Sequence, residues 1–527
     1  MKYFYFILIF EFLVSQYPME YRFNDSDLYR YDAISDSGFA SNGIMDIRSL
    51  DDEILFLGTG AGLSFVDLSS ISNMQYGNFN LSEMPKGGNP ALAVDKDLIV
   101  FSGVVDTLVP TGFESKGTGL AYSMNDGEDW NYLSQPVDPV PNLEDNGFQT
   151  ISWGNQQISA LSVTTNINNV SYDIAVGNQY IYTANWAAGI RRYNYLSSSG
   201  QTKKWEIIPL PRDDDLDLYC GDINVSEYEI NPKDPGDGGN HNHKGFGVYI
   251  IEDTLWVGTA AGINKGIILG DNCINWIRHY QSGLDNISGN WVIGFTYQQL
   301  NGYNRIWAIT WATQYPETNA LSYSNNGGAS WNIVNPLGNE SGKVYNLNVY
   351  GNRVWASTER GLYYSEDGER WEKHGQLIDL LTGEVILSEA VFSTYFSQSM
   401  ETLFVGTGDG LAIINESMSN ITRFWGPPDP FSAYPNPFLI NDHNKFGNDG
   451  HMRFIFLNPN NFHGIIDIYD FAMDRVIQLD DSHLIGDESE IIWNGRNEYG
   501  DKISNGVYFC RLSLNGQRYW TKLAVIN

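Results

Sequence analysis

The sequence predicts an all-β protein: a seven-bladed β-propeller followed by a smaller C-terminal β-domain. The main observation is a repeat, in which an apolar strand-like phrase, a small-residue turn and a second apolar phrase recur seven times. The composition agrees, because 53 glycines, 32 tyrosines and 15 tryptophans suit an aromatic-packed β-protein with glycine turns. Repeated sheets that cannot bury both faces alone must stack on their neighbours, and a closed ring of them is a propeller. The clear copies are 54–63, 255–263, 354–362 and 403–411, and the looser copies are 98–102, 181–190 and 306–310.

Each repeat is expected to form the middle of a four-stranded sheet. In the fourth copy the alternation at 255–257 predicts a strand, and Thr259 and Gly262 predict the turn that follows it. A further strand candidate precedes every copy and is expected to be the first strand of its blade. These first strands are predicted at 44–47, 91–94, 172–176, 246–251, 291–296, 344–349 and 391–395.

A tryptophan-bearing phrase follows six of the seven copies and supplies the fourth strand of the blade. We expect these side chains to pack between neighbouring blades, and the alternative role is a stacking platform for a sugar. The six residues are Trp130, Trp205, Trp276, Trp331, Trp371 and Trp425.

Three of the predicted hairpins share a further motif between their last two strands. Residues 123–130 (SMNDGEDW) and 324–331 (SNNGGASW) fit the pattern Ser-x-Asp/Asn-x-Gly-x-x-Trp, and 365–371 (SEDGERW) is one residue shorter. They resemble the Asp-box hairpins of sialidase-like and related β-propellers, although Asn125 and Asn326 replace the usual Asp. A short polar side chain bonds the turn backbone, glycine permits the bend and tryptophan packs below. The motif therefore indicates a fold rather than an activity.

Charge excludes several partners. The 527 residues include 63 Asp and Glu against 31 Lys and Arg, so the formal net charge is −32. A field of that sign repels phosphate backbones and anionic membrane surfaces, which argues against nucleic acid as a partner. The balance is typical of an extracellular protein.

The N-terminus resembles an export signal. Lys2 precedes an apolar run at 3–14, and Ser15 is a small residue where cleavage would fall, so 1–16 is predicted to be a signal peptide. Glu11 interrupts the run, and a retained N-terminal anchor is the alternative. Nothing later in the sequence predicts a transmembrane span in the mature protein.

Cysteine usage does not indicate a disulfide scaffold. Only Cys220, Cys273 and Cys510 occur, which is few for a secreted chain of this size. Cys220 and Cys273 flank the same predicted blade, so the sequence leaves open whether they pair. Cys510 lies in an apolar strand and is expected to be a buried thiol.

The last hundred residues differ from the repeats. A proline-rich linker at 426–431 follows the predicted propeller at 17–425, and the segment 432–527 then carries YPNPF, WNGRNE and GVYF in order. The segment also reads as a small β-sandwich, with tight-turn dipeptides at Asn494-Gly495 and Asn505-Gly506.

These motifs resemble the C-terminal sorting domain of type IX secretion substrates, which is related to the immunoglobulin-like module of the flagellar hook-capping protein. The resemblance implies a bacterial protein that the type IX machinery exports through this domain and that is secreted or held on the outer-membrane surface. An accessory Ig-like module without a transport role is the alternative. The motif residues are Tyr434, Pro435, Asn436, Pro437, Trp493, Gly495, Arg496 and Gly506.

Two insertions interrupt the repeats, at 134–170 and 209–247, and the second is the richer in chemistry. Asp213, Asp215 and Asp217 alternate as at the start of a calcium loop, which makes them a candidate calcium site. Leu218 stands where an EF-hand needs glycine, so a solvated acidic loop is the alternative. His241 and His243 could ligate a transition metal only with a third ligand that the sequence does not supply.

No catalytic residue is assigned. A glycosidase needs two carboxylates across a cleft, and Asp173, Asp285 and Glu389 lie near predicted inner strands without any reason to meet. A sialidase needs several converging arginines, and the predicted inner strands offer Arg48, Arg305 and Arg353. No P-loop, zincin motif or nucleophile elbow occurs in the sequence.

We therefore expect a secreted or surface propeller that binds an extracellular protein or glycan at the axial face of its ring. The alternative is a propeller-type glycoside hydrolase or polysaccharide lyase. Two carboxylates with exposed aromatic residues at the axial mouth would favour the enzyme, and a mouth of backbone and neutral side chains would favour binding.

Overall fold

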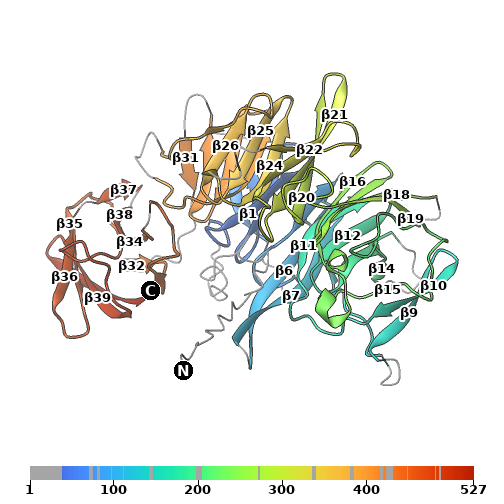
Figure 1. Ribbon diagram of the computed structural model, residues 1–527. Helices are drawn as coiled ribbons and strands as arrows, with labels where there is room; N and C mark the ends of the chain where they lie inside the picture. Colours follow the sequence, from blue (N-terminus) through green and yellow to red (C-terminus); the bar gives the residue numbers. More distant parts are fainter. Residues whose placement is uncertain are drawn as a thin grey trace, which may run out of the picture.

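The fold was obtained as a computed structural model. It describes residues 38–527 except 70–74, 80–83, 96–97, 111, 142–145, 197–203, 271–272, 335–336, 338–339, 380–384, 416–418, 423–430, 448, 481 and 486–487. The predicted signal peptide, the predicted linker up to residue 430 and Trp425 lie outside these residues. The described chain is nearly all β, as predicted (Figure 1).

Seven four-stranded antiparallel sheets follow one another through the described residues up to Thr422. In each sheet the strands are paired in chain order, so consecutive hairpins build every sheet from its inside to its outside. The first three sheets are β1 (Ile44–Ser49), β2 (Ile54–Thr59), β3 (Gly62–Asp67) and β4 (Gln75–Asn78); β5 (Leu92–Asp95), β6 (Leu98–Val109), β7 (Gly112–Ser123) and β8 (Asn131–Leu133); and β11 (Ser171–Gly177), β12 (Tyr180–Asn185), β13 (Gly189–Asn194) and β14 (Glu206–Ile208).

The remaining four sheets repeat this order. They are β16 (Gly245–Ile251), β17 (Thr254–Thr259), β18 (Gly262–Ile268) and β19 (Ile274–Tyr280); β20 (Trp291–Leu300), β21 (Tyr303–Trp311), β22 (Ala320–Ser324) and β23 (Asn332–Val334); β24 (Val344–Tyr350), β25 (Arg353–Thr358), β26 (Gly361–Ser365) and β27 (Glu372–Lys373); and β28 (Val391–Ser397), β29 (Thr402–Thr407), β30 (Gly410–Ile414) and β31 (Ser419–Thr422).

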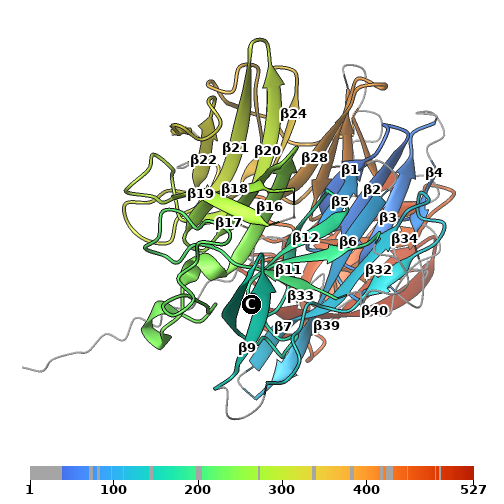
Figure 2. The ribbon, with the colours of Figure 1, turned by 90° about the vertical axis from the view of Figure 1, so that its right-hand side faces the viewer.

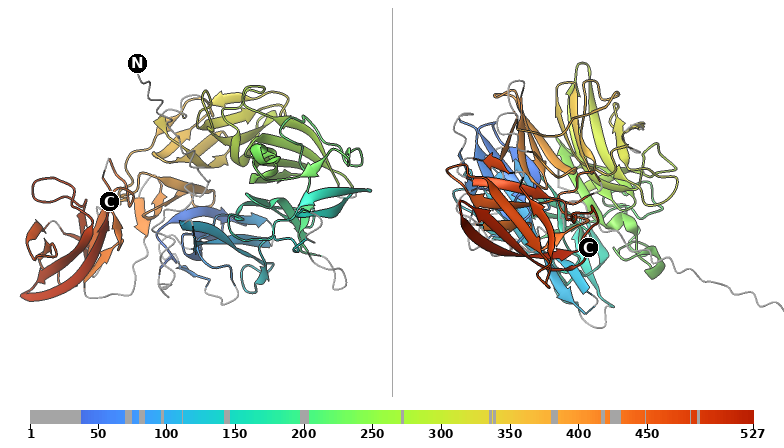
Figure 3. Two further views of the ribbon diagram at one scale, coloured as in Figure 1. Left: turned by 60° about the horizontal axis from the view of Figure 1, so that its bottom comes forward. Right: turned by 90° about the vertical axis from the view of Figure 1, so that its left-hand side faces the viewer.

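The first strands of the seven sheets are neighbours in a closed cycle. The strand β1 contacts β5, and contacts continue through β11, β16, β20 and β24 to β28, which contacts β1 again. The chain therefore returns to its starting sheet, and the sheets surround a common axis (Figure 3, left). Each of these first strands overlaps a segment predicted from the sequence.

The second sheet departs from the prediction. The sequence indicated a short strand at 98–102, whereas β6 and β7 each run for 12 residues. The extra length projects beyond the other strands and exposes Leu108 and Phe113 near its tip. Beyond residue 102, glycines and charged residues interrupt the alternation of apolar and polar residues. The sequence therefore did not indicate this extension.

The tryptophans pack where neighbouring sheets meet. Trp130 lies against Phe79 and Phe101, with ring centroids 5.5 and 5.3 Å apart, and Trp331 lies against Trp256 at 5.9 Å. Trp276 and Trp331 are almost fully buried. Burial leaves no free face for a sugar on these two, whereas Trp130, Trp205 and Trp371 are half-buried.

The three repeated turns share one set of hydrogen bonds. In the first, the hydroxyl of Ser123 accepts from the backbone N–H of Gly127 at 2.9 Å, and the Asn125 side chain accepts from that of Asp129 at 3.0 Å. Ser324 and Ser365 accept equivalent bonds from Gly328 and Gly368, both at 2.8 Å. All three glycines have positive φ, which a side chain would disfavour.

The two insertions meet in a separate sheet that neither would form alone. The strands β9 (Phe148–Trp153) and β10 (Gln156–Leu161) come from the first insertion, and β15 (Glu229–Ile230) from the second pairs in parallel with β10. The second insertion also contains the short 3-10 helices η4 (Pro235–Asp237) and η5 (His241–His243). Figure 2 shows β9 beside the third and fourth sheets.

A disulfide fixes this accessory sheet to the fourth sheet. Cys220 of the second insertion is bonded to Cys273, immediately before β19, with their Cα atoms 6.1 Å apart. Gly154, in the β9–β10 turn, lies against both sulfur atoms. The disulfide therefore joins both insertions to the outer edge of the ring.

A buried ion pair anchors the first insertion to the third sheet. Arg191 of β13 donates two hydrogen bonds to the carboxylate of Asp138, at 2.7 and 2.8 Å, and both side chains are buried. Burial alone would raise the pKa of Asp138, but Arg191 and the backbone N–H of Val163 together hold that pKa below its ordinary value.

We expect Asp138→Asn to destabilise the protein by about 2 kcal/mol at pH 7, because a charge-assisted bond to a buried arginine is lost. Since the folded pKa is depressed, this stabilisation is present above the unfolded pKa of about 3.9 and is lost as the pH falls through the folded value. Urea titrations from pH 7 to pH 3 should show the two curves converging. A difference that persists undiminished at the lowest pH would contradict the role of the charge.

The last part of the described chain forms two facing sheets. The first consists of β32 (Phe431–Tyr434), β34 (Met452–Leu457), β38 (Glu488–Trp493) and β37 (His483–Ile485), and the second of β33 (Phe438–Leu439), β40 (Gln517–Ile526), β39 (Gly506–Leu514), β35 (Gly464–Tyr469) and β36 (Arg475–Leu479). Phe454, Ile468, Trp493 and Leu512 belong to one buried core between them.

A fully buried ionic cluster docks this C-terminal domain, which is drawn in red in Figure 1, on the seventh sheet. Arg453 of β34 pairs with Asp409, in the turn before β30, and with Glu490 of β38 at 2.9 Å. Arg453 also donates to the carbonyl of Val385 at 2.8 Å, and the backbone N–H of Gly447 donates to Glu389 at 2.7 Å. The contact is therefore polar and specific rather than a loose apposition.

Among the described residues, no helix has the length and hydropathy that a membrane span needs.

Candidate functional site

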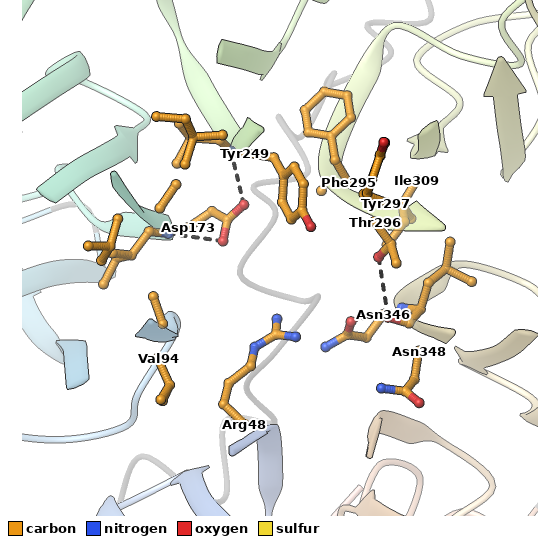
Figure 4. Close-up of a pocket in the computed structure, with 18 of the residues that line it drawn as sticks. Arg48, Val94, Asp173, Tyr249, Phe295, Thr296, Tyr297, Ile309, Asn346 and Asn348 are labelled. Atoms are coloured by element: carbon orange, nitrogen blue, oxygen red, sulfur yellow. Dashed lines mark hydrogen bonds between the residues drawn. The ribbon is translucent and has the colours of Figure 1, made fainter. Parts of the chain in front are cut away.

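A cavity of about 360 Å³ lies on the axis of the ring. It is lined from six of the seven first strands or their ends, namely β1, β5, β11, β16, β20 and β24. Figure 4 shows side chains from these strands pointing into one space. No other described feature brings so many sheets to one place, which makes this axial cavity the candidate site.

A repeated β-bulge builds the floor of the axial cavity. In six of the seven first strands one residue is left out of the ladder with the second strand. A bulge re-aims the side chain of its extra residue. The six bulged residues are apolar and belong to one buried cluster, so they close the axis on one side: Met45, Tyr172, Phe246, Ile293, Tyr345 and Phe392.

Small or polar residues follow the bulges and form the first layer above the floor. Asp46 of β1 is buried, accepts from the backbone N–H of Ile47 at 3.0 Å and accepts from the amide of Asn346 at 3.2 Å. Arg48 donates to Asp46 at 3.3 Å and to the carbonyl of Leu92 at 3.4 Å. Asp46 therefore orients the guanidinium and the amide that reach into the cavity.

Asp173 of β11 fastens two neighbouring sheets together. Its carboxylate accepts from the backbone N–H of Ile174 and from that of Val248 in β16, both at 2.9 Å. The inner edge of a first strand has no ladder partner, so a side chain that satisfies it stabilises the ring. Both carboxylate oxygens are thus held by backbone donors.

The upper wall of the axial cavity is aromatic with polar tips. Tyr249 of β16 and Phe295 and Tyr297 of β20 line it together with Thr296 and Asn348. Burial raises the pKa of Tyr249, and the nearby charge of Arg48 partly opposes that rise. Arg48, Tyr249 and Asn346 converge from three sheets (Figure 4).

The structure separates the three carboxylates considered for catalysis. Asp173 lines the axial cavity, whereas Asp285 pairs with Arg278 at 2.9 Å and Glu389 lies against the C-terminal domain. The exposed Asp95, at the end of β5, is the second carboxylate of the lining. The axial lining thus contains two carboxylates and aromatic residues, the feature that would favour an enzyme.

The arginines considered for a sialidase-like centre do not converge. Arg48 alone lines the axial cavity. Arg305 lies over the rings of Trp307 and Tyr323, and Arg353 forms an exposed pair with Glu366.

Two aspartates of the candidate calcium site bond to other groups of the second insertion. Asp213 accepts from the backbone N–H groups of His241 and Asn242, at 3.0 and 2.7 Å, and Asp215 pairs with Arg212. Asp217 is exposed. No group of three or more His, Cys, Asp or Glu in the described part of the chain could hold a metal ion, so the calcium hypothesis finds no support in this geometry.

His241 and His243 do not form a ligand pair. His243 is buried, with its ring nitrogens 2.9 Å from the backbone N of Asn231 and 3.1 Å from the carbonyl of Leu210. Burial lowers the pKa of His243, which keeps the ring neutral in the fold. His243 therefore holds the second insertion in place.

Residues of the sorting-domain resemblance form contacts inside the C-terminal domain. Asn436, between the cis-prolines Pro435 and Pro437, donates to the carbonyl of Lys522 at 2.8 Å and accepts from the N–H of Ala524 at 3.0 Å. The start of the domain is thereby attached to β40.

The second group of these residues forms one turn. The indole of Trp493 donates to the carbonyl of Arg496 at 2.9 Å, and Arg496 donates to Asp449 at 2.6 and 2.8 Å. Gly495 has φ of +70°, and a Cβ there would collide with Ile440. Tyr434 ends β32 and Gly506 begins β39.

Sequence reasoning missed Asp46, Asn346 and Tyr249. A signal existed, because an apolar residue precedes a polar or small one near the start of six first strands, as in Met45-Asp46, Tyr172-Asp173 and Tyr345-Asn346. Only the bulge gives the two residues of such a pair different surroundings, and a bulge has no marker in a single sequence.

No family model and no curated protein matches the chain. Among solved structures, PorZ, described as an essential surface component of the type IX secretion system of Porphyromonas gingivalis, is 12% identical, with 92% of this chain and 81% of PorZ covered and a TM-score of 0.28. A virginiamycin B lyase from Staphylococcus aureus is 10% identical over 74% of this chain and 98% of the lyase, with a TM-score of 0.37. At these TM-scores no property of either protein is transferred to this chain.

Proposed function

We propose that this is a bacterial protein, secreted or held on the outer-membrane surface, whose seven sheets are the blades of a β-propeller that binds an extracellular glycan or protein at its axis. The C-terminal domain is Ig-like and serves as the type IX sorting signal. The single observation that carries the binding function is the axial cavity, where six sheets contribute to one pre-formed, polar and aromatic pocket. The disulfide between Cys220 and Cys273 supports an oxidising compartment.

Binding is favoured over catalysis because the inner carboxylates already have partners. Asp46 holds Asn346 and Arg48, and Asp173 holds two backbone N–H groups. A catalytic pair needs two available carboxylates, and these bonds leave one in the lining, the exposed Asp95.

The second candidate function is a glycoside hydrolase or lyase, which the joint presence of Asp95 and Asp173 in the lining favours. Release of reducing ends or unsaturated sugars from a polysaccharide panel, abolished in Asp95→Asn, would establish it.

An array of immobilised polysaccharides and secreted proteins tests the binding function. We expect the full-length chain to bind at least one ligand and Asn348→Trp, which fills the axial cavity, to lose that binding at least tenfold. Asn352→Trp, in the exposed turn between β24 and β25, is the matched control and should bind normally. Equal binding by both variants would place the ligand elsewhere.

Removal of residues 431–527 tests the export route. We expect the truncated chain to accumulate in the periplasm of the native host instead of reaching the surface or the medium. The deletion takes Arg453 away from the buried Asp409, so the truncated chain should also carry Asp409→Asn to preserve the seventh sheet. Unchanged secretion of a truncated chain that keeps its melting temperature would refute the sorting function.

A further inference from the structure

The charges around the axial cavity exclude most charged ligands. Arg48 is paired with Asp46, so the pair contributes little net charge. The remaining lining carboxylates and the net charge of −32 repel anions. A metal cation lacks sufficient ligands, because Asp46 and Asp173 already accept hydrogen bonds from two or more donors each, which leaves the exposed Asp95 as the remaining carboxylate at the cavity. A neutral ligand is not repelled by the negative charge and does not need free carboxylates as ligands.

The remaining polar groups match hydroxyls. Arg48 uses Nε and Nη2 for Leu92 and Asp46, and among the described residues Nη1 is left to face the cavity. Asn348 accepts through Oδ1 from the backbone N–H of Phe396 at 3.3 Å, which leaves its amide N–H groups to donate, and the phenol of Tyr249 can both donate and accept. Such a mixture of donors and acceptors suits vicinal hydroxyls, each of which is itself a donor and an acceptor.

The volume and the lining of the axial cavity suit a single sugar ring. Its volume of about 360 Å³ is near the lower end of the range for small-molecule pockets. The bulged residues close its floor, and the rings of Tyr249 and Tyr297 offer apolar surface beside the polar groups. A pyranose likewise combines C–H faces with a hydroxyl-bearing edge.

We propose that the axial cavity binds one neutral pyranose unit, such as the terminal hexose of an extracellular glycan. This inference rests on the proposed binding function and narrows it to a ligand class. Arg48 and Asn348 bond the hydroxyl edge, Tyr249 bonds a hydroxyl and packs against the ring, and Asp46 acts only by positioning Arg48.

Saturation-transfer NMR and calorimetry test the proposal with methyl glycosides of glucose, galactose and mannose, and with glucuronic acid as the anionic match. We expect at least one glycoside to bind and glucuronic acid to bind at least tenfold more weakly. Arg48→Lys, which keeps the charge beside Asp46, should weaken binding at least fivefold, and Tyr249→Phe about threefold. Arg353→Lys and Tyr499→Phe are exposed controls that should bind as the unmodified protein does.

The outcomes distinguish a failure of the pyranose inference from a failure of the proposed binding function. Tighter binding of glucuronic acid, weakened by salt, would overturn the neutral class. Cavity-dependent binding on the array without any monosaccharide binding would overturn the pyranose inference and leave the proposed function standing. Array binding that Asn348→Trp leaves unchanged would overturn both.

Discussion

Replacement of Arg453 by methionine is expected to release the C-terminal domain from the seventh sheet and to lower its free energy of unfolding by about 3–5 kcal/mol. The guanidinium, Asp409 and Glu490 are almost completely shielded from water. Burial is the larger influence on Asp409 and raises its pKa, while Arg453 opposes that rise. Without Arg453, two carboxyl groups stay buried without their shared cation, and undocking is the route by which they regain water. Calorimetry should show a separate, earlier transition for the domain.

Variants of the two acids distinguish docking from folding of the domain. Asp409→Asn changes only the ring side of the contact, so it should weaken docking, seen as faster proteolysis between the two parts, while the domain itself stays folded. Glu490→Gln changes the domain side and should lower the domain's own stability. Arg518→Met, an exposed substitution on β40, is the control. The triple variant Asp409→Leu, Arg453→Met, Glu490→Leu should recover docking, because an apolar replacement leaves no buried charge. Unchanged calorimetry of Arg453→Met would contradict the role of this cluster.

Loss of the Cys220–Cys273 disulfide is expected to cost about 4 kcal/mol, the chain-entropy value for a loop of 53 residues. The effect should concentrate in the accessory sheet, since the disulfide packs on the β9–β10 turn at Gly154. Cys220→Ser with Cys273→Ser should therefore lower the melting temperature and open both insertions to protease, with cuts mapped by mass spectrometry.

Reduction provides the matching control for the disulfide. A reductant should bring the unmodified protein to the melting temperature of the double variant and leave the double variant unchanged. Cys510→Ala removes a buried thiol in the C-terminal domain and should leave the insertions resistant to protease. Equal protease sensitivity with and without the disulfide would show that the accessory sheet holds itself together.

Much of the ring was predictable because each of its seven sheets is local in sequence. The strands β16 to β19 are consecutive hairpins, and their alternation, Gly262 and Trp276 are visible in the sequence. Hydrogen bonds between neighbouring strands then follow from short turns. The C-terminal motifs could be recognised in the sequence for the same reason, since Trp493, Gly495 and Arg496 belong to one turn.

The candidate site was far less predictable, because it is made by residues that no local rule brings together. Asp46 and Asn346 are 300 positions apart and meet only because the ring closes. The three aspartates at 213–217 looked like a metal site because they are adjacent, yet two of them bond to His241, Asn242 and Arg212 within the same region. The calcium site therefore stays a prediction from the sequence, whereas the candidate site on the axis depends on residues from distant parts of the chain.

The sequence by itself determined the first strands of the seven sheets, the repeated turns and the division into repeats and a C-terminal domain, since these depend on alternation, glycine and proline over a few residues. Only the tertiary structure decided which side chains face the axis, how the two insertions share one sheet and that Arg453 pairs with Asp409. The physical reason is that burial and charge pairing act through space: a polar side chain acquires its role from the partners that folding brings within hydrogen-bond distance.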